Sequence, residues 1–244
     1  MCKFTGDFLP QGEIHVWELW LNPPYALDKK HTSVLSSQEQ ARAEAFGSAK
    51  LRTRYILAHF GLRSILGLYL KCEPDEIIYG HELYGKPYIA VPDPGGLHFN
   101  LTYSQDLALI ALMRSNLIGI DLEYCKLIPD IDQLVTRYFS PEERSQYFQL
   151  RSEERMDAFY RCWTRKEAFG KALGGGLSIS LSSFCVSLLP DEPARLIRLD
   201  GDATAPNRWQ IQDFSPEIGY EAAVAVDGEI SRMVSWQWDD LSTV

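Results

Sequence analysis

The stretch that decides the fold is Phe159-Tyr-Arg-Cys-Trp-Thr-Arg-Lys-Glu-Ala-Phe-Gly-Lys-Ala-Leu-Gly-Gly-Gly-Leu177. It contains Trp163, Glu167 and Lys171 at intervals of four residues, which places an indole, a carboxylate and an ammonium on one face of a helix. The three glycines at 174–176 supply the left-handed backbone that ends such a helix. The same spacing also fits a solvated Glu/Lys surface pair, so the partner of this face decides its role.

Bulk composition limits the classes of function. The 244 residues are 45% hydrophobic, enough for a core, and the net charge of −9 disfavours general binding to nucleic acid or to an anionic membrane. The five cysteines are scattered, without metal-ligand spacing, which indicates reduced thiols and no zinc. The N-terminus lacks the apolar run of a signal peptide, and no stretch is apolar enough to cross a bilayer. We therefore expect a cytoplasmic protein.

The order of the elements predicts an α+β fold of two similar lobes, 1–117 and 118–244, with the active site between them. Each lobe is expected to hold a long helix on a small antiparallel sheet, the two being related by a pseudo-twofold axis. Ser36 with Glu39, and Ser140 with Glu143, form capping-box patterns before the helices. The expected long helix of the first lobe spans 51–70 and aligns with the quoted stretch over residues 54–67 and 161–174. Strands are expected at 14–21, 107–113, 117–122, 179–188, 209–214 and 220–226, with 107–113 and 117–122 joined as a hairpin.

Two acids end the strand Gly119-Ile-Asp-Leu-Glu123. Because Asp121 and Glu123 are two residues apart, both carboxylates leave one face of the strand, about 6 to 7 Å apart. Hard oxygen ligands without nearby His or Cys favour Mg²⁺ over a transition metal. A solvated acidic strand end is the alternative, and Glu167 as a third acid on a rigid helix weighs against it.

Four motifs in order carry a family resemblance: Tyr84-Gly-Lys-Pro87, Phe99-Asn-Leu-Thr-Tyr-Ser104, Gly119 to Glu123, and Trp163 to Lys171 with the glycines that follow. Together they resemble the paired signature of the 4'-phosphopantetheinyl transferases, in the surfactin-type branch. Members of that branch resemble a two-lobed pseudodimer, and the duplication seen here suits a monomer.

The resemblance implies transfer of the phosphopantetheine arm of coenzyme A to a serine of an apo acyl or peptidyl carrier protein, releasing adenosine 3',5'-bisphosphate. It implies a Mg²⁺ ion held by Asp121, Glu123 and Glu167, with Glu167 as proton acceptor and Lys171 stabilising the departing phosphate.

Further contacts with coenzyme A are expected from basic and polar residues outside the acids. Arg42, Arg54 and Lys86 match family positions, and Lys166 is a further candidate for a phosphate contact. Thr102 and Tyr103 stand where the family usually has Ser-His, which replaces an imidazole with a side chain that is neutral at pH 7.

The carrier protein is expected to dock beside Glu123, on the segment 124–134, with Leu127 and Ile128 exposed and Tyr138 and Phe139 extending the surface. Lys126 and Arg137 would meet an acidic carrier. Two other readings stay open from the residues alone: a metal-dependent nuclease, which the net charge disfavours, and a carrier-binding or coenzyme-A-sensing protein without turnover.

Overall fold

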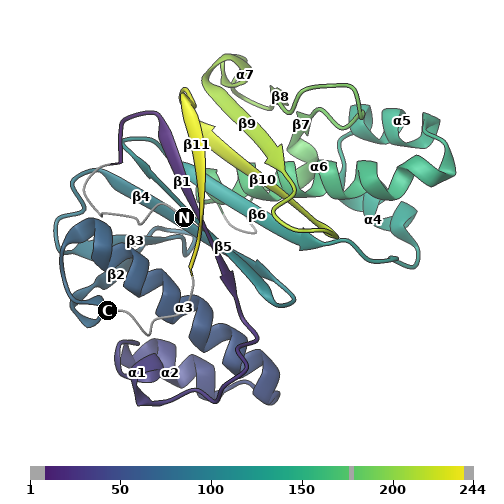
Figure 1. The fold of residues 1–244 in the computed structure, drawn as a ribbon. Helices are drawn as coiled ribbons and strands as arrows, with labels where there is room; N and C mark the ends of the chain where they lie inside the picture. Colours follow the sequence, from purple (N-terminus) through teal and green to yellow (C-terminus); the bar gives the residue numbers. More distant parts are fainter. Residues whose placement is uncertain (1–8, 176–178, 239–244) are drawn as a thin grey trace.

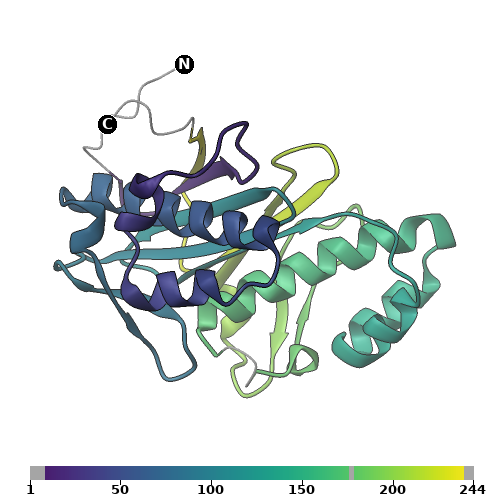
Figure 2. The same ribbon diagram turned by 90° about the horizontal axis from the view of Figure 1, so that it is seen from below.

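The quoted stretch forms the central helix of the second half of the chain. The computed structural model describes residues 9–175 and 179–238, and within it helix α6 spans Ser152–Leu173 (Figures 1 and 2). It ends as predicted, at Gly174 in the left-handed conformation with φ of 71°. Gly176 and Leu177 of the quoted stretch lie outside the described residues, as does Cys2.

Helix α6 packs on a three-stranded antiparallel sheet in the order β6-β10-β9. The strands are β6 (Ile118–Tyr124), β10 (Tyr220–Asp227) and β9 (Trp209–Phe214). Their contact with the helix is built from small residues, since Ala223 and Ala225 of β10 join Ala168 and Ala172 of α6 in one buried cluster. Small side chains bring the helix backbone close to the strands, and the residues that α6 carries therefore lie near the ends of β6.

The first half has its own long helix, α3 (Ala49–Leu70), on a four-stranded sheet in the order β11-β1-β5-β4. The strands are β11 (Arg232–Gln237), β1 (Glu13–Trp20), β5 (Leu107–Arg114) and β4 (Leu97–Ser104). Apolar residues of α3, among them Leu62, Ile65 and Leu66, are buried against Trp17, Phe99 and Ile110 of the sheet. The mixed α+β class is confirmed, and the pseudo-twofold relation of two lobes stays a prediction.

One strand crosses the predicted division at 117/118. Strand β11 lies near the C-terminus but pairs with β1, and it does so in parallel, so the first sheet is not purely antiparallel as predicted. A buried cluster also joins the two sheets, with Ile14 and Val16 of β1 packed with Ile120 and Val224 of the second sheet. The two halves therefore share a continuous apolar core, with the second half supplying an edge strand to the first.

The predicted hairpin of 107–113 with 117–122 is wrong. Strand β5 pairs with β1 and β4, whereas β6 pairs with β10. Strand β6 instead runs beside β4, joined to it by side chains of β4: Asn100 Oδ1 accepts from the Ile120 amide at 2.8 Å, and Ser104 Oγ accepts from the Tyr124 amide at 3.1 Å. Polar side chains at every second position of β4 thus face the strand that carries the two acids.

The remaining elements are short. They are α1 (Lys29–Ser33), α2 (Ser37–Glu44), β2 (Ile78–His81), β3 (Pro87–Val91), α4 (Ile131–Tyr138), α5 (Pro141–Gln149), β7 (Phe184–Val186), β8 (Leu196–Leu199) and α7 (Ala205–Arg208), with 3-10 turns at Pro74–Glu76 and Leu181–Ser183. Both predicted capping boxes are confirmed, at the starts of α2 and α5. The strand predicted over 179–188 is shorter than expected, because only Phe184–Val186 pair.

None of the helices in the described part of the chain has the length and apolarity that a membrane span requires. The four described cysteines, Cys72, Cys125, Cys162 and Cys185, are free thiols, as predicted.

Candidate active site

The ammonium of Lys171 joins helix α6 to the acidic end of β6. Its Nζ lies 2.6 Å from Oδ1 of Asp121, 3.0 Å from the hydroxyl of Thr102 and 3.2 Å from the Ile120 carbonyl. Asp121 is only 5% exposed, so this ion pair is screened far less than a surface pair. The helix face singled out in the sequence therefore does meet a partner, and that partner is the first acid of the strand.

The two glutamates complete an acidic cluster around this pair. Glu123 accepts a hydrogen bond from Ser104 at 3.2 Å. Burial, and then the negative charge of Asp121, raise the pKa of Glu123. The same two causes, in the same order, raise the pKa of Glu167, against the opposing effect of Lys171. The negative charges of the three carboxylates therefore repel one another, and a cation placed between them would relieve that repulsion.

One oxygen tests whether these residues fit a metal ion. Oδ2 of Asp121 is buried and has no hydrogen-bond partner, although Oδ1 of the same carboxylate is bonded to Lys171. Among the described residues, no group of three His, Cys, Asp or Glu side chains is arranged so that it could hold a metal ion by itself. Mg²⁺ does not need one, since it commonly binds through one or two carboxylates, water and substrate phosphates. The orphaned oxygen and the all-carboxylate donor set fit Mg²⁺.

Gly119 explains why α6 lies close enough for these contacts. A Cβ atom at this position would lie 2.9 Å from Cα of Ala172, and closer still to the Ala172 amide nitrogen and the carbonyl oxygen of Ala168. All three are backbone atoms of the helix, which cannot turn aside as a side chain could. The first glycine of the acidic motif thus sets the distance between the strand that carries Asp121 and the helix that carries Glu167 and Lys171.

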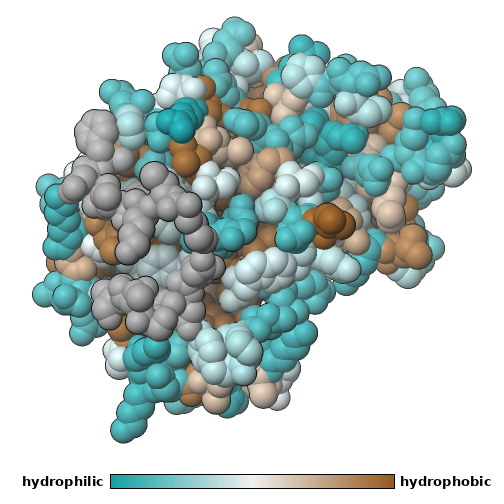
Figure 3. Space-filling view, viewed as in Figure 1, coloured by the Kyte–Doolittle hydropathy of each residue, from teal (hydrophilic) through white to brown (hydrophobic). Residues whose placement is uncertain are grey.

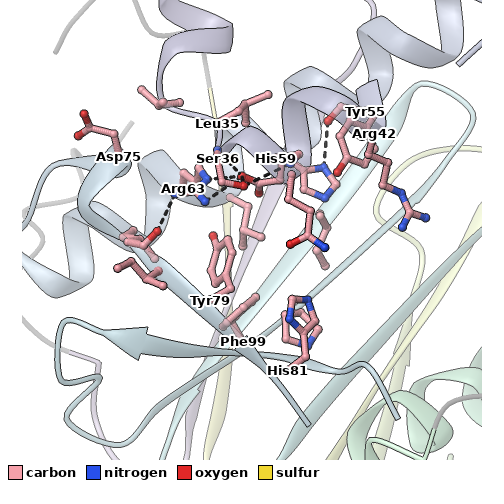
Figure 4. A pocket seen from close by; sticks show the side chains of 18 of the residues that line it. Leu35, Ser36, Arg42, Tyr55, His59, Arg63, Asp75, Tyr79, His81 and Phe99 are labelled. Atoms are coloured by element: carbon pink, nitrogen blue, oxygen red, sulfur yellow. Dashed lines mark hydrogen bonds and ion pairs between the residues drawn. The ribbon is translucent and has the colours of Figure 1, made fainter. Parts of the chain in front are cut away.

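A cavity of about 940 Å³ opens beside this cluster, between strand β4, hairpin β2–β3 and helices α2 and α3 (Figure 4). Lys171 and Thr102 line it where it meets the acids, and Arg63, Tyr79 and Asp75 line it farther away. Its volume suits a ligand of the size of a nucleotide derivative. The cavity therefore adjoins the acidic cluster through Lys171 and Thr102, which both contact Asp121.

The basic residues predicted to contact the ligand have different positions. Arg42 of α2 is exposed and lines the cavity, with its guanidinium 6.0 Å from the ring centre of Tyr55. The guanidinium of Arg54 is turned instead to Asp106, 2.7 Å away, and the structure does not bring it to the cavity wall. Lys86 donates to the carbonyls of Ile118 and Ala172, so it braces hairpin β2–β3 against β6 and α6.

The prediction for Lys166 is wrong. Its side chain is fully buried, and Nζ donates to both oxygens of Glu143 at 2.7 Å and to the Phe184 carbonyl at 2.8 Å. An ammonium with three bonds inside the core cannot reach a phosphate. Its function is to tie α6 to α5 and β7, which fixes the helix that carries the neighbouring Glu167.

Several cavity residues were not recognised from the sequence, chiefly Tyr55, His59 and Arg63 of α3, and Glu39 of α2. Arg63 is 2% exposed and bonded to Glu39 at 2.8 Å. A charged residue within the apolar stripe of the 51–70 helix was the available signal, because a buried arginine needs a carboxylate partner.

Comparisons of the sequence with known proteins indicate one family. A profile described as the 4'-phosphopantetheinyl transferase superfamily matches residues 117–226. The 4'-phosphopantetheinyl transferase HetI of Nostoc sp. is 39% identical over 221 residues, 90% of this chain and 90% of that protein. The 4'-phosphopantetheinyl transferase Sfp of Bacillus subtilis is 28% identical and covers 86% of this chain and 90% of its own length. A solved holo-[acyl-carrier-protein] synthase of Thermotoga maritima matches 46% of this chain and 62% of its own, with a TM-score of 0.36 and 22% identity.

Proposed function

The chain belongs to the 4'-phosphopantetheinyl transferases, and from that membership we propose that it transfers the phosphopantetheine arm of coenzyme A to a serine hydroxyl of an apo acyl or peptidyl carrier protein, dependent on Mg²⁺. The observation that carries the proposal is the convergence of Asp121, Glu167 and Lys171, of which Lys171 also lines the 940 Å³ cavity. A metal-dependent nuclease, open on the residues alone, does not agree with this family.

Each site residue has a role in the proposed reaction. Asp121, Glu123 and Glu167 would hold Mg²⁺, which would neutralise charge on the diphosphate of coenzyme A. Lys171 lies one helical turn from Glu167 and donates to the phosphate that departs, and its ion pair with Asp121 orients the ammonium. Thr102 accepts from the same ammonium, with its hydroxyl 3.0 Å from Nζ, and lies beside the Asp121 carboxylate.

Glu167 is our proposed proton acceptor. The serine oxygen forms a bond to the phosphorus nearer the pantetheine arm, the bond from that phosphorus to the bridging oxygen breaks, and adenosine 3',5'-bisphosphate leaves. The serine proton passes to Glu167, directly or through water. In the protein without a bound metal, burial and then the charge of Asp121 raise the pKa of this carboxyl.

We propose that the carrier docks on the loop between β6 and α4, beside Glu123. Leu127 of this loop is 86% exposed, and hydrophobic residues gather at that edge of the face drawn in Figure 3. Ile128 packs partly against the core, and Tyr138 packs against Trp163 with ring centres 5.5 Å apart. Phe139 is excluded from the docking surface, contrary to the prediction, because it is 1% exposed.

The remaining parts of the proposal concern assembly and location. The acids and Lys171 all come from one chain, which supports a functional monomer. A cytoplasmic location is supported by the free thiols at the four described cysteines.

The test is the intact mass of an apo carrier protein incubated with this protein, coenzyme A and Mg²⁺, beside a Glu167→Gln control. A gain of one phosphopantetheine arm with the wild type, lost in the control, is the expected result. Coenzyme A binding without any gain across several carriers would favour a sensing protein. Neither binding nor gain would refute the proposed reaction.

A further inference from the structure

One histidine in the cavity wall is held in a single orientation. Nδ1 of His59 is 3.0 Å from the Tyr55 carbonyl one helical turn earlier, and its ring stacks on the Tyr55 ring with centres 3.9 Å apart and planes at 27° (Figure 4). A carbonyl only accepts, so Nδ1 must carry the proton in this bond. The neutral ring then has Nε2 as a hydrogen-bond acceptor, not a donor.

Charged groups surround this ring from several elements. Glu39 and Arg42 face it from α2, and Arg63 faces it from its own helix α3. Burial is the largest influence and lowers the pKa of His59; Arg42 and Arg63 lower it further, against the Tyr55 carbonyl and Glu39. The other titratable or charged residues that line the cavity are Tyr55, Asp75, Tyr79, His81, Tyr103 and Lys171. The imidazole is therefore neutral near pH 7 while the cavity holds no anion.

A phosphate group changes this balance. Phosphate oxygens accept hydrogen bonds, and so does a neutral Nε2, so the two cannot bond until the imidazole gains a second proton. Arg42 and Tyr103 line the same cavity, and the charge of Arg42 acts on Tyr103. A phosphate between these side chains would place negative charge next to His59 and favour its protonated form.

We propose that His59 takes up a proton from solvent when coenzyme A binds, and that its Nε2–H then donates to a phosphate of that ligand. The inference rests on the proposed function and adds a residue to it. The proton makes affinity depend on pH in a defined direction. Between the pKa of His59 in the free protein and its pKa in the complex, one proton is bound per ligand, so Kd rises about tenfold for each unit of pH.

The experiment is calorimetric titration of the wild-type protein with coenzyme A in EDTA, from pH 6.5 to 8. Two buffers of different ionisation enthalpy give the number of protons taken up. The second pKa of a phosphate monoester is about 6, so at pH 7 and above only about a tenth or less of the 3'-phosphate is singly protonated, and the ligand's own titration contributes little there. We expect net proton uptake at pH 7 and a Kd that rises between pH 7 and pH 8, by up to about tenfold if the bound imidazole stays protonated over this range.

Two variants assign the proton. His59→Gln keeps a donor for the Tyr55 carbonyl but cannot take up a proton, so its proton uptake and its rise in Kd with pH should disappear. His81→Gln is the matched control, because His81 lines the same cavity from β2, and it should retain both. A titration with 3'-dephospho-coenzyme A separates the phosphates: loss of uptake assigns the contact to the 3'-phosphate, and retained uptake assigns it to the diphosphate.

The outcomes separate the two proposals. Tight binding of coenzyme A without proton uptake in the wild type would overturn the role of His59 and leave the transferase proposal standing. Uptake that persists in His59→Gln, or vanishes only in His81→Gln, would also overturn it. No binding of coenzyme A at all would remove the proposed function and this inference with it.

Discussion

Substitution of Gly119 by Ala should separate the acidic strand from the helix that completes the site. The added Cβ would lie 2.9 Å from Cα of Ala172, and nearer still to the Ala168 carbonyl oxygen. Carbon contacts are optimal at about 3.5 to 4.0 Å, so α6 must move away from β6 by about 1 Å. A displacement of that size at reacting groups costs about 10²-fold in rate. Overpacking of this kind also costs about 1–3 kcal/mol of folding free energy.

The assay measures kcat for transfer of the phosphopantetheine arm to an apo carrier, together with the free energy of unfolding in urea. Gly170→Ala is the matched control, because Gly170 lies on the same helix and a Cβ there meets no atom within 4 Å. That control should keep full activity and gain about 1 kcal/mol of stability, the usual difference between Ala and Gly inside a helix.

The two variants differ in what the added methyl group meets. Gly119→Ala that is folded, as stable as wild type and fully active would refute the claim that close backbone approach sets the site. Gly170→Ala that loses activity to the same extent would show that any added methyl group in this region is harmful, and the specific contact with β6 would no longer explain the effect.

Three further predictions test the charges and the docking surface. In metal-free protein, burial and then the charge of Asp121 raise the pKa of Glu123 above its value in the unfolded chain. The contribution of Glu123 to folding stability is therefore full below the unfolded pKa and is lost as the pH rises through the folded pKa. Glu123→Gln should therefore raise the Tm at pH 7 in EDTA, by less at pH 4, and should abolish the rise in Tm that Mg²⁺ gives the wild type; an unchanged Tm at pH 7 would contradict this. Lys166→Met leaves Glu143 buried without its cation and should cost about 3–5 kcal/mol in urea unfolding, and a loss below about 1 kcal/mol would show that the pair is not structural. Leu127→Asp should raise the KM for the carrier at least fivefold, about 1 kcal/mol at an interface, with the Kd for coenzyme A unchanged; an unaltered KM would place the docking surface elsewhere.

The helices were predictable because their signals are local. The capping boxes at Ser36 and Ser140 place a hydroxyl and a glutamate three residues apart, and both start helices in the structure. The acids Asp121 and Glu123 were identified for the same reason, since alternation along one strand puts both on one side. Local spacing therefore predicts which side chains share a face of a helix or strand. Only the structure shows which residues that face contacts.

The strand pairings depend on more distant parts of the chain. Nothing within residues 107–122 indicates that β6 pairs with β10, about 100 residues later, or that β4 faces it through side chains such as Asn100. The burial of Lys166 was equally hidden. Lysine beside glutamate on a helix usually lies in solvent, and the partner that reverses this, Glu143, lies 23 residues earlier in a different helix.

The two capping glutamates show how one structural device serves different ends in the two halves. Glu39 caps α2 and binds Arg63 of the long helix α3, and Arg63 donates in turn to the carbonyls of Pro74 and Ile77 in the segment that follows α3. Glu143 caps α5 and binds Lys166 of the long helix α6.

Lys166 then donates to the Phe184 carbonyl in the segment that follows α6, so each buried cation joins a short helix, a long helix and the chain after it. In the first half this unit forms a wall of the cavity, since Glu39 and Arg63 line it. In the second half the corresponding pair does not line this cavity. It holds helix α6 in place, and with it Glu167, the residue after Lys166. A wall of the cavity and the carboxylate proposed as proton acceptor thus rest on the same arrangement of a capping glutamate and a buried cation, and breaking the pair should impair ligand affinity in the first half and turnover in the second.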